Sequence, residues 1–381
     1  MEQWTDHKRY LWLFGLVVPL FPFMGGGLAT LTGWSVFWFI GPILILGLIP
    51  AIDLAAGIDR SNPPDDLIAT LEADKYYRWI TYFFLPLQYL ALIWACWLWA
   101  GDTLSVVDKV GLALTVGTVA GVGINTAHEL GHKKEKVERW LAKIALAQSF
   151  YGHFYIEHNR GHHVRVATPV DPASSRVGES LYAFLPRTVV GSLQSAWRLE
   201  QPRFKRRDES HWSIRNDVLN AWLMSVVLWA VLLIVFGLAI LPYLLLQAAV
   251  GIVLLEIVNY LEHYGMLRQK EHTGRYERVR PSHSWNSNNI ATNVLLYHLQ
   301  RHSDHHANPT RRYQALRDME EAPVLPTGYA GMILLALFPP LWYRTMDPRV
   351  LAHFDGDMSR ANIQPSKRNK VLARYPVPET A

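Results

Sequence analysis

Apolar residues in this chain fall into long uncharged runs, separated by polar stretches in which histidine and basic residues gather. Between Tyr10 and Ile52 there is no Asp, Glu, Lys or Arg, which is enough chain for two transmembrane helices of roughly 20 residues each. Later apolar runs are long enough for four more. The pattern therefore predicts six transmembrane helices, over residues of about 10–30, 33–53, 79–101, 108–128, 217–237 and 240–262.

A last uncharged stretch, residues 322–343, is interrupted by Pro323, Pro326, Pro339 and Pro340. Proline removes a helical hydrogen bond and clashes with the preceding turn, so a full span is not expected here. We predict a short re-entrant or interfacial element instead. The expected fold is thus an all-α integral membrane protein, formed by one membrane-embedded domain over residues 1–381.

Basic residues indicate the orientation of the predicted spans. With six spans and the N-terminus inside, every Lys and Arg except Lys109 falls on the cytoplasmic side, as the positive-inside rule requires. This prediction places both termini in the cytoplasm. It also makes residues 128–216 and 263–321 cytoplasmic metal-binding segments, followed by a polar tail over 355–381.

Composition excludes several classes of function. Half of the residues are hydrophobic and only 18% are charged, as in a membrane protein. The single cysteine, Cys96, rules out disulfides and cysteine-held iron–sulfur or zinc sites. No Gly-x-Gly-x-x-Gly follows a strand pattern, so a flavin or nicotinamide domain is not expected. A nucleic-acid partner is not expected either.

Histidines form the most informative pattern in the chain. They occur in "HELGHK" at 128–133, "EHNRGHH" at 157–163 and "LQRHSDHH" at 299–306, and once in "NYLEHYG" at the end of the sixth span. Residues three or four apart share one face of a helix, and imidazole is a common ligand for transition metals. We therefore predict as metal ligands His128, His132, His158, His162, His163, His263, His302, His305 and His306.

Nine imidazoles exceed the four to six donors around one ion and suit two ions with four or five ligands each. A dinuclear site is therefore predicted, and iron, zinc and copper all accept imidazole. The alternative without a metal is that the histidines form a solvated, weakly basic face. Three helically spaced sets of histidines on one side of the membrane argue against it. A structural role is expected for His7, His211, His272, His283 and His353, and is favoured for His153 and His298.

A zinc protease is a remote alternative, because "HELGH" fits the His-Glu-x-x-His motif in which two histidines hold zinc and the glutamate is the general base. Such a site needs only one further ligand. It would leave six or more aligned histidines without a role.

The four histidine-bearing strings resemble those of the bacterial alkane 1-monooxygenases, within the membrane fatty-acid desaturase and hydroxylase superfamily. Met266 is the one position near the motifs where leucine would be expected. The resemblance implies two non-haem iron ions, O2 as co-substrate, and hydroxylation of the terminal methyl of medium-chain alkanes to primary alcohols. It further implies a bacterial inner membrane location and electrons from rubredoxin, itself reduced by a rubredoxin reductase. Alternatives are a xylene-type aromatic-methyl monooxygenase and a fatty-acyl desaturase or hydroxylase.

Elementary chemistry agrees with this implication. Breaking an unactivated methyl C–H bond needs a redox-active metal, which zinc is not. An alkane partitions into the bilayer, so a tunnel between the spans that ends at the metals can collect it. Trp34, Phe37 and Trp38 are candidates for the distal end of that tunnel, although interfacial anchoring by aromatic side chains is the favoured role.

Other charged residues have predicted supporting roles. A carboxylate that accepts the far N–H of a ligand imidazole fixes its tautomer. Candidates for this role are Glu129, Glu157, Glu262 and Asp304 within the motifs, and Glu256 inside the sixth span, which is expected to pair with Asn125 or a ligand histidine, or to be neutral. Basic residues that an acidic electron carrier would contact, or that anchor to lipid headgroups, are Lys205, Arg206, Arg207, Arg311 and Arg312.

Overall fold

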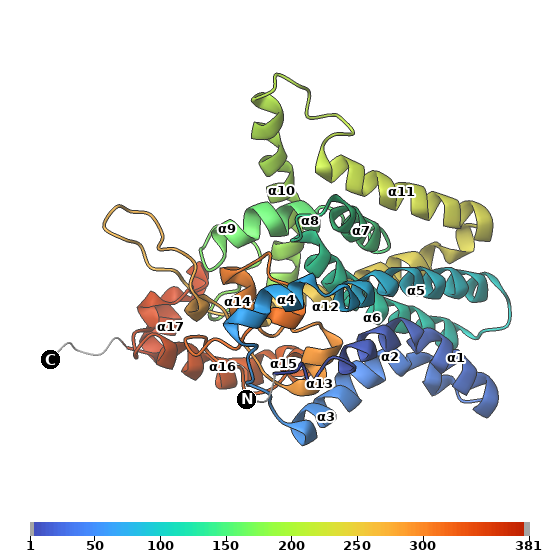
Figure 1. Ribbon diagram of the computed structural model, residues 1–381, viewed down its shortest axis with the longest axis horizontal. Helices are drawn as coiled ribbons and strands as arrows, with labels where there is room; N and C mark the ends of the chain where they lie inside the picture. The colour runs from blue at the N-terminus through green and yellow to red at the C-terminus, as the bar shows by residue number, and fades with distance from the viewer. Residues whose placement is uncertain (1–3, 377–381) are drawn as a thin grey trace.

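The computed structural model describes residues 4–376 as an all-helical protein, in which only isolated bridges, and no β-strands, occur among the described residues (Figure 1). Six helical segments are long and apolar enough to cross a membrane, as predicted. Their ends differ by at most four residues from the expected ones. The segments are Leu11–Thr32 (η1, Leu11–Leu20, and α1, Phe21–Thr32), Ser35–Ala56 (η2, Ser35–Phe39; α2, Ile40–Ile43; η3, Leu44–Leu48; α3, Ile49–Ala56), α5 (Lys75–Ala100), α6 (Val106–Gly131), α11 (Asp217–Phe236) and Leu238–His263 (η6, Leu238–Ile240, and α12, Leu241–His263).

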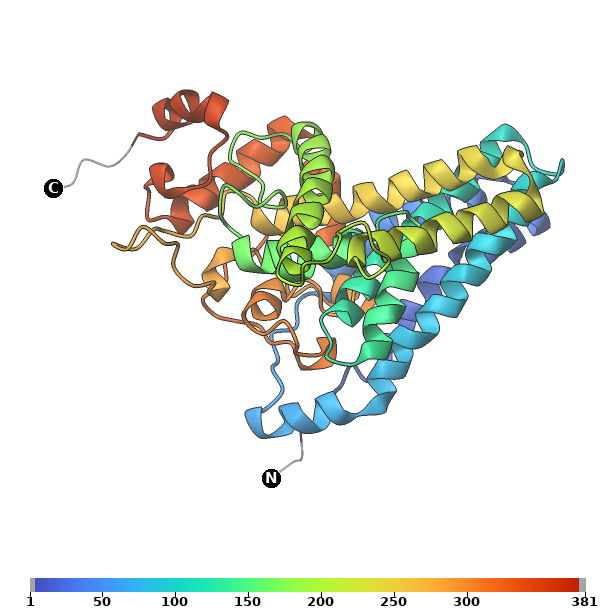
Figure 2. The same ribbon diagram turned by 90° about the horizontal axis from the view of Figure 1, so that it is seen from above.

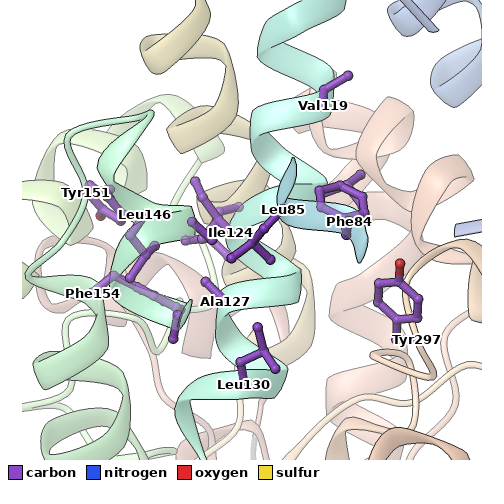
Figure 3. Packing of buried hydrophobic residues seen from close by; sticks show 14 of the residues in the cluster. Phe84, Leu85, Val119, Ile124, Ala127, Leu130, Leu146, Tyr151, Phe154 and Tyr297 are labelled. Atoms are coloured by element: carbon purple, nitrogen blue, oxygen red, sulfur yellow. The ribbon is translucent and has the colours of Figure 1, made fainter. Parts of the chain in front are cut away.

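Helix α6 is the central span and is buried along most of its length. It begins with a capping box, in which the Ser105 side chain accepts from the Asp108 N–H and the Asp108 carboxylate accepts from the Ser105 N–H. Figure 3 shows Ile124 and Ala127 of α6 packed close to Leu85 of α5 and Leu146 of α7 (Lys136–Ala147). Because its neighbours hold α6 on several sides, its last turn has a fixed position.

Small residues bring α6 and α12 into close contact. A Cβ added at Gly117 would lie 2.5 Å from the Val250 Cβ, and one added at Gly251 would lie 2.9 Å from the Ala120 Cβ. Helices in a membrane approach most closely where glycine or alanine lines the interface. This contact sets His128, near the end of α6, and His263, at the end of α12, on the same side of the molecule.

The remaining helices lie on the side of the molecule where α6 and α12 end. Helix α10 (Leu181–Lys205) runs outward from that region to the loop before α11 (Figures 1 and 2). The others are short: η4 (Asp65–Leu67), α4 (Ile68–Ala73), α8 (Phe154–Ile156), η5 (Glu157–His162), α9 (His163–Arg165), η7 (Pro281–His283), α13 (Ile290–Leu295), α14 (His302–Ala307) and η8 (Tyr313–Ala315).

The proline-rich stretch forms two short helices, α15 (Tyr329–Ala336) and α16 (Pro339–His353), neither of which is among the six candidate spans. Helix α15 packs against α12 and η3, so it rests on the membrane-spanning part as a re-entrant or interfacial element would. Beyond it, η9 (Met358–Arg360), η10 (Pro365–Lys367) and α17 (Arg368–Arg374) complete the described tail. Asn362 and Gln364 bond to the backbone around Val177, so the tail is docked on the segment before α10.

Candidate metal centre

All nine predicted histidines converge into two groups, whose potential ligand nitrogens lie within 4.8 Å of one another in each group. The groups draw on four parts of the chain that are far apart in sequence: the ends of α6 and α12, the η5–α9 turn, and α14. The first group is His128, His132, His158, His163 and His305. The second group is His162, His263, His302 and His306.

The ring nitrogens in the first group are spaced as ligands of one ion. His163 Nε2 lies 3.0 Å from His158 Nε2 and 3.1 Å from His305 Nε2. Two nitrogens bound at about 2.1 Å to a common ion at roughly right angles are about 3 Å apart. Buried nitrogens His128 Nε2 and His132 Nε2 have no hydrogen-bond partner among the described residues. A buried polar atom without a partner is costly, and a metal ion would satisfy both.

The second group has the same spacing. His302 Nε2 lies 3.2 Å from His263 Nε2 and 2.9 Å from His306 Nε2. His162 Nε2 is buried and, among the described residues, has no hydrogen-bond partner. All four residues are buried, so this group is shielded from water.

A π-helical turn divides the histidines of "EHNRGHH" in a way that differs from the expected geometry. The i, i+4 spacing predicts that His158 and His162 share one face of an α-helix. Instead η5 is a π-helix, in which residues five apart stack, so His158 joins His163 in the first group and His162 enters the second. On α14, His302 and His306 are four apart and share the second group, while His305 enters the first.

Burial keeps six of these imidazoles neutral. Desolvation first, and then the neighbouring imidazoles, lowers the pKa of His132, His158 and His305 well below the ordinary value. The same two causes lower the pKa of His163, His302 and His306. A neutral imidazole keeps a lone pair for a metal, whereas a protonated one does not. Four imidazoles of the first group and two of the second are therefore in the form that binds a metal.

Asp171 supports the second group, and the sequence pattern did not reveal it. Its Oδ2 lies 2.9 Å from His162 Nδ1 and accepts from the Ser174 hydroxyl at 2.6 Å. Burial disfavours the charge of Asp171, but the His162 ring and Ser174 overcome this and hold its pKa at about 2. The carboxylate therefore stays ionised and pairs with Nδ1 of His162, which leaves the Nε2 atom of that ring free to bind a metal. No histidine spacing points to a residue in the loop after α9.

Replacing Asp171 with alanine should therefore weaken metal retention. We expect apparent metal affinity to fall about 10- to 100-fold, with a smaller loss for Asp171→Asn, which keeps a neutral acceptor. The measurement is the rate at which a chelator removes metal from the purified protein. Asp355→Asn, at an aspartate whose side chain is 86% exposed, is the control and should match the parent protein. Equal metal release from all these proteins would contradict the role of Asp171.

The predicted carboxylates within the motifs mostly contact cations instead of imidazoles. Glu129 lies 2.9 Å from Lys133 Nζ, Arg165 donates to Glu157 at 2.8 Å, and Arg311 donates to both oxygens of Asp304 at 2.6 Å. Glu262 is the exception of the four, since one of its oxygens lies 3.3 Å from His302 Nδ1. The ion pair at Glu129 also argues against a zinc protease, whose glutamate must be free to act as a base.

Glu256 is bound in a polar network inside the sixth span, but not to the expected partner. Tyr151 donates to it at 2.6 Å, Thr188 at 2.8 Å and Asn259 at 3.1 Å. The prediction of Asn125 as its partner is wrong, because the Asn125 side chain donates to the Leu296 carbonyl at 2.8 Å.

The predicted basic residues fall into two kinds. Arg311 is occupied by Asp304, and Arg312 is buried and donates to Glu135 and Glu138, so both guanidinium groups are engaged within the protein. By contrast, Lys205, Arg206 and Arg207 are exposed at the end of α10. An acidic partner could therefore contact the positive charges of these three residues, but not those of Arg311 and Arg312.

An apolar cavity, here called the inner cavity, is lined in part by residues that precede three of the histidines on the same chain segments. Its lining includes Asn125, Val258 and Leu299, which precede His128, His263 and His302 by three, five and three residues. The inner cavity is bounded by η3, α3, α6, α12, α13 and α15. Its lining is almost entirely apolar, so it suits a hydrocarbon and repels water.

None of the three predicted tunnel aromatics lines the inner cavity. Trp34 is 66% exposed and stacks on Phe37, whereas Trp38 is buried near Trp94. The exposed position of Trp34, between the first two spans, fits the anchoring role better than a tunnel end.

The geometry agrees with sequence relationships to known proteins. Residues 109–336 match the family described as fatty acid desaturase. The chain is 49% identical over 368 residues to Alkane 1-monooxygenase 1 of Alcanivorax borkumensis (strain ATCC 700651 / DSM 11573 / NCIMB 13689 / SK2), covering 96% of this chain and 91% of that protein. The chain belongs to the alkane 1-monooxygenase family. As a member of the alkane 1-monooxygenases it is an oxidoreductase.

Other alkane 1-monooxygenases are similar to this chain over nearly its whole length. That of Acinetobacter baylyi (strain ATCC 33305 / BD413 / ADP1) is 48% identical over 378 residues, covering 97% of this chain and 91% of the relative. The Xylene/toluene monooxygenase hydroxylase component XylM of Pseudomonas putida is more distant, at 27% over 248 residues, 64% of this chain and 65% of that protein. The predicted family, membrane class and enzyme class are therefore confirmed.

Proposed function

We propose that the protein is a non-haem di-iron monooxygenase that hydroxylates the terminal methyl group of medium-chain alkanes to primary alcohols. The observation that carries this proposal is the pair of histidine groups, together with an apolar cavity whose lining includes residues three to five positions before His128, His263 and His302. An alkane has no polar group to bind, so an apolar cavity must hold it by shape alone. Two metal sites beside that cavity would act on whichever carbon enters first.

Iron is the metal that fits both the donors and the reaction. Imidazoles accept iron, zinc or copper, but zinc has no redox chemistry. Iron in the two groups would supply the oxidising power that activates O2 and breaks a methyl C–H bond. The residues of the protein would hold the metals and orient the substrate. The imidazoles would bind the ions, Asp171 would fix the tautomer of His162, and the apolar lining would exclude water and direct the end of the alkane toward the metals.

Topology and charge support a cytoplasmic location for the metal centre. An even number of spans would leave both ends of the chain on one side of the membrane, and the exposed cations of α10 and α17 would then favour the cytoplasmic side for the histidines. In a bacterium this orientation corresponds to the inner membrane, with an electron supply from the cytoplasm.

We propose that rubredoxin delivers the electrons at the basic end of α10. Glu200 of α10 forms an ion pair with Arg160, which lies between His158 and His162 in the η5 turn. Lys205, Arg206 and Arg207 follow Glu200 by five to seven residues and are exposed. An acidic carrier bound there would contact the helix that is joined directly to the metal-binding turn.

Neutralising this basic end should slow electron delivery. For Lys205→Gln/Arg206→Gln/Arg207→Gln we expect the apparent KM for rubredoxin to rise about tenfold at low salt, and the difference to shrink at high salt. A matched control neutralises three exposed cations of α17, Arg368, Lys370 and Arg374. An equal rise in the α17 variant, or none in the α10 variant, would place the docking surface elsewhere.

The direct test of the proposed function is a reaction with octane. Purified protein, supplied with rubredoxin, its reductase and 18O2, should form octan-1-ol with one labelled oxygen and should contain two irons per chain. Octene would indicate a desaturase, and alcohol without label would exclude O2 as the oxygen source.

Aromatic-methyl hydroxylation is the second candidate, supported by the similarity to XylM. The higher identity and coverage of the match to Alkane 1-monooxygenase 1 of Alcanivorax borkumensis, 49% against 27% for XylM, favour a linear chain. We therefore expect octane to be oxidised with a higher kcat/KM than m-xylene, and the reverse order would favour the aromatic substrate.

A further inference from the structure

Two apolar hollows lie on either side of a wall that includes two side chains. Besides the inner cavity there is an outer groove lined by Leu11 and Phe14 of η1, Ile52 and Ala56 of α3, and Ile290, Ala291 and Val294 of α13. Ile49 of α3 and Leu295 of α13 line both the inner cavity and the outer groove. These two side chains are therefore the shared boundary between the two spaces.

The outer groove opens where lipid surrounds the first two spans. Phe14 is 55% exposed, Ile52 39% and Leu11 37%, and the lining residues are all apolar. A hydrocarbon dissolved in the bilayer can enter such a groove without crossing water, which it would do only at a large cost in free energy. The groove is thus continuous with the phase in which an alkane concentrates.

The backbone around the wall is held by polar contacts, whereas the wall side chains are apolar. Asp53, one turn after Ile49, accepts from the Thr292 N–H at 3.0 Å and also from its hydroxyl. A Cβ at Gly328 would lie 2.2 Å from the Asp53 carboxylate, so α15 approaches closely at the same point. These contacts hold the backbone near Ile49 and Leu295, so a rotamer change of the two side chains is the smallest motion that could open a passage between the two spaces.

We infer that Ile49 and Leu295 form the gate through which a linear alkane passes from the bilayer, by way of the outer groove, into the inner cavity. This inference rests on the proposed function. It makes the outer groove the access route and gives the two side chains control over how fast substrate reaches the metal centre.

A second lipid-facing groove is the competing route. It lies between α5, α7 and α11 and is lined by residues such as Tyr89, Trp140 and Leu223. It shares no lining residue with the inner cavity. Substrate in this second groove would therefore have no direct path to the histidine groups.

Thiol labelling can distinguish the two grooves. The only cysteine in the sequence, Cys96, is buried, so a new exposed cysteine can be modified selectively. Phe14→Cys places a thiol in the outer groove, and Leu223→Cys, at a residue that is 44% exposed, places one in the second groove. Each protein is modified in membranes with a small methyl thiosulfonate or with a bulky benzyl maleimide.

The bulky label at Phe14→Cys should lower kcat/KM for octane about tenfold relative to the unlabelled variant, while the methyl label changes it less than about twofold. Iron content should be unchanged, and both labels at Leu223→Cys should have no effect. Loss of kcat/KM with the Leu223→Cys label, or none with the Phe14→Cys label, would overturn the gate. Octanol formation by the unlabelled proteins tests the proposed function separately, because the gate concerns only the change on labelling. Absence of octanol from the unlabelled parent protein would remove the proposed function and this inference with it.

Discussion

Alanine at His305 or at His306 should abolish octanol formation, each through loss of a different metal ion. These neighbours on α14 belong to different histidine groups, although both are buried on the same short helix. Removing one imidazole leaves four donors in the first group or three in the second, in a site without replacement ligands. We expect activity to fall by at least about 100-fold, and iron content to drop from two toward one per chain, with a different Mössbauer signal lost in each variant.

His211→Ala is the control for these two variants. His211 packs against Trp197 and Trp212 and belongs to neither histidine group. Its replacement should leave both irons and nearly full turnover. Full activity in either α14 variant, or loss of the same iron signal in both, would contradict the division of the nine histidines into two groups.

Zinc should fill both histidine groups and yield an inactive protein. Imidazole donors accept zinc as readily as iron, so zinc added to metal-free protein should raise its thermal stability. Turnover of octane should remain absent, because zinc has no accessible second oxidation state. Addition of ferrous iron to the same metal-free protein should restore both stability and octanol formation.

The two measurements separate binding from chemistry. Thermal stability depends on whether the histidine groups hold an ion, whereas octanol formation depends on whether that ion can change its oxidation state. Octanol formed by zinc-loaded protein from which iron has been removed would rule out an iron-based reaction. Failure of zinc to stabilise the protein would show instead that the groups do not hold a metal through the nine imidazoles.

The spans were predictable because each depends on a local property, the length of an apolar run. No comparable local signal marks the roles of α13 and α15, which form walls of the inner cavity only through contacts with the first two spans and α12. Asp53 illustrates the difference: in sequence it ends an apolar run, and in the fold its side chain binds Thr292, more than 200 residues away.

The histidines were predictable as a set but not as two groups. Spacing assumes a regular α-helix, and the π-helical turn at 157–162 adds one residue to that period. Such a turn depends on its surroundings, including the pairing of Arg160 with Glu200 and of Arg165 with Glu157. Asp171 escaped prediction for a related reason, because the contact with His162 depends on how the loop after α9 folds back.

The alternation of neighbours between the two groups has a consequence for loading. His162 and His163 are adjacent in the chain, as are His305 and His306, and in each pair one ring belongs to each group. An ion bound in the first group would restrain both backbone segments, and so would lower the conformational entropy cost of arranging the second group. We therefore expect the second ion to bind more tightly than the first when iron is limiting, whereas iron in excess should still fill the one intact group of an α14 variant.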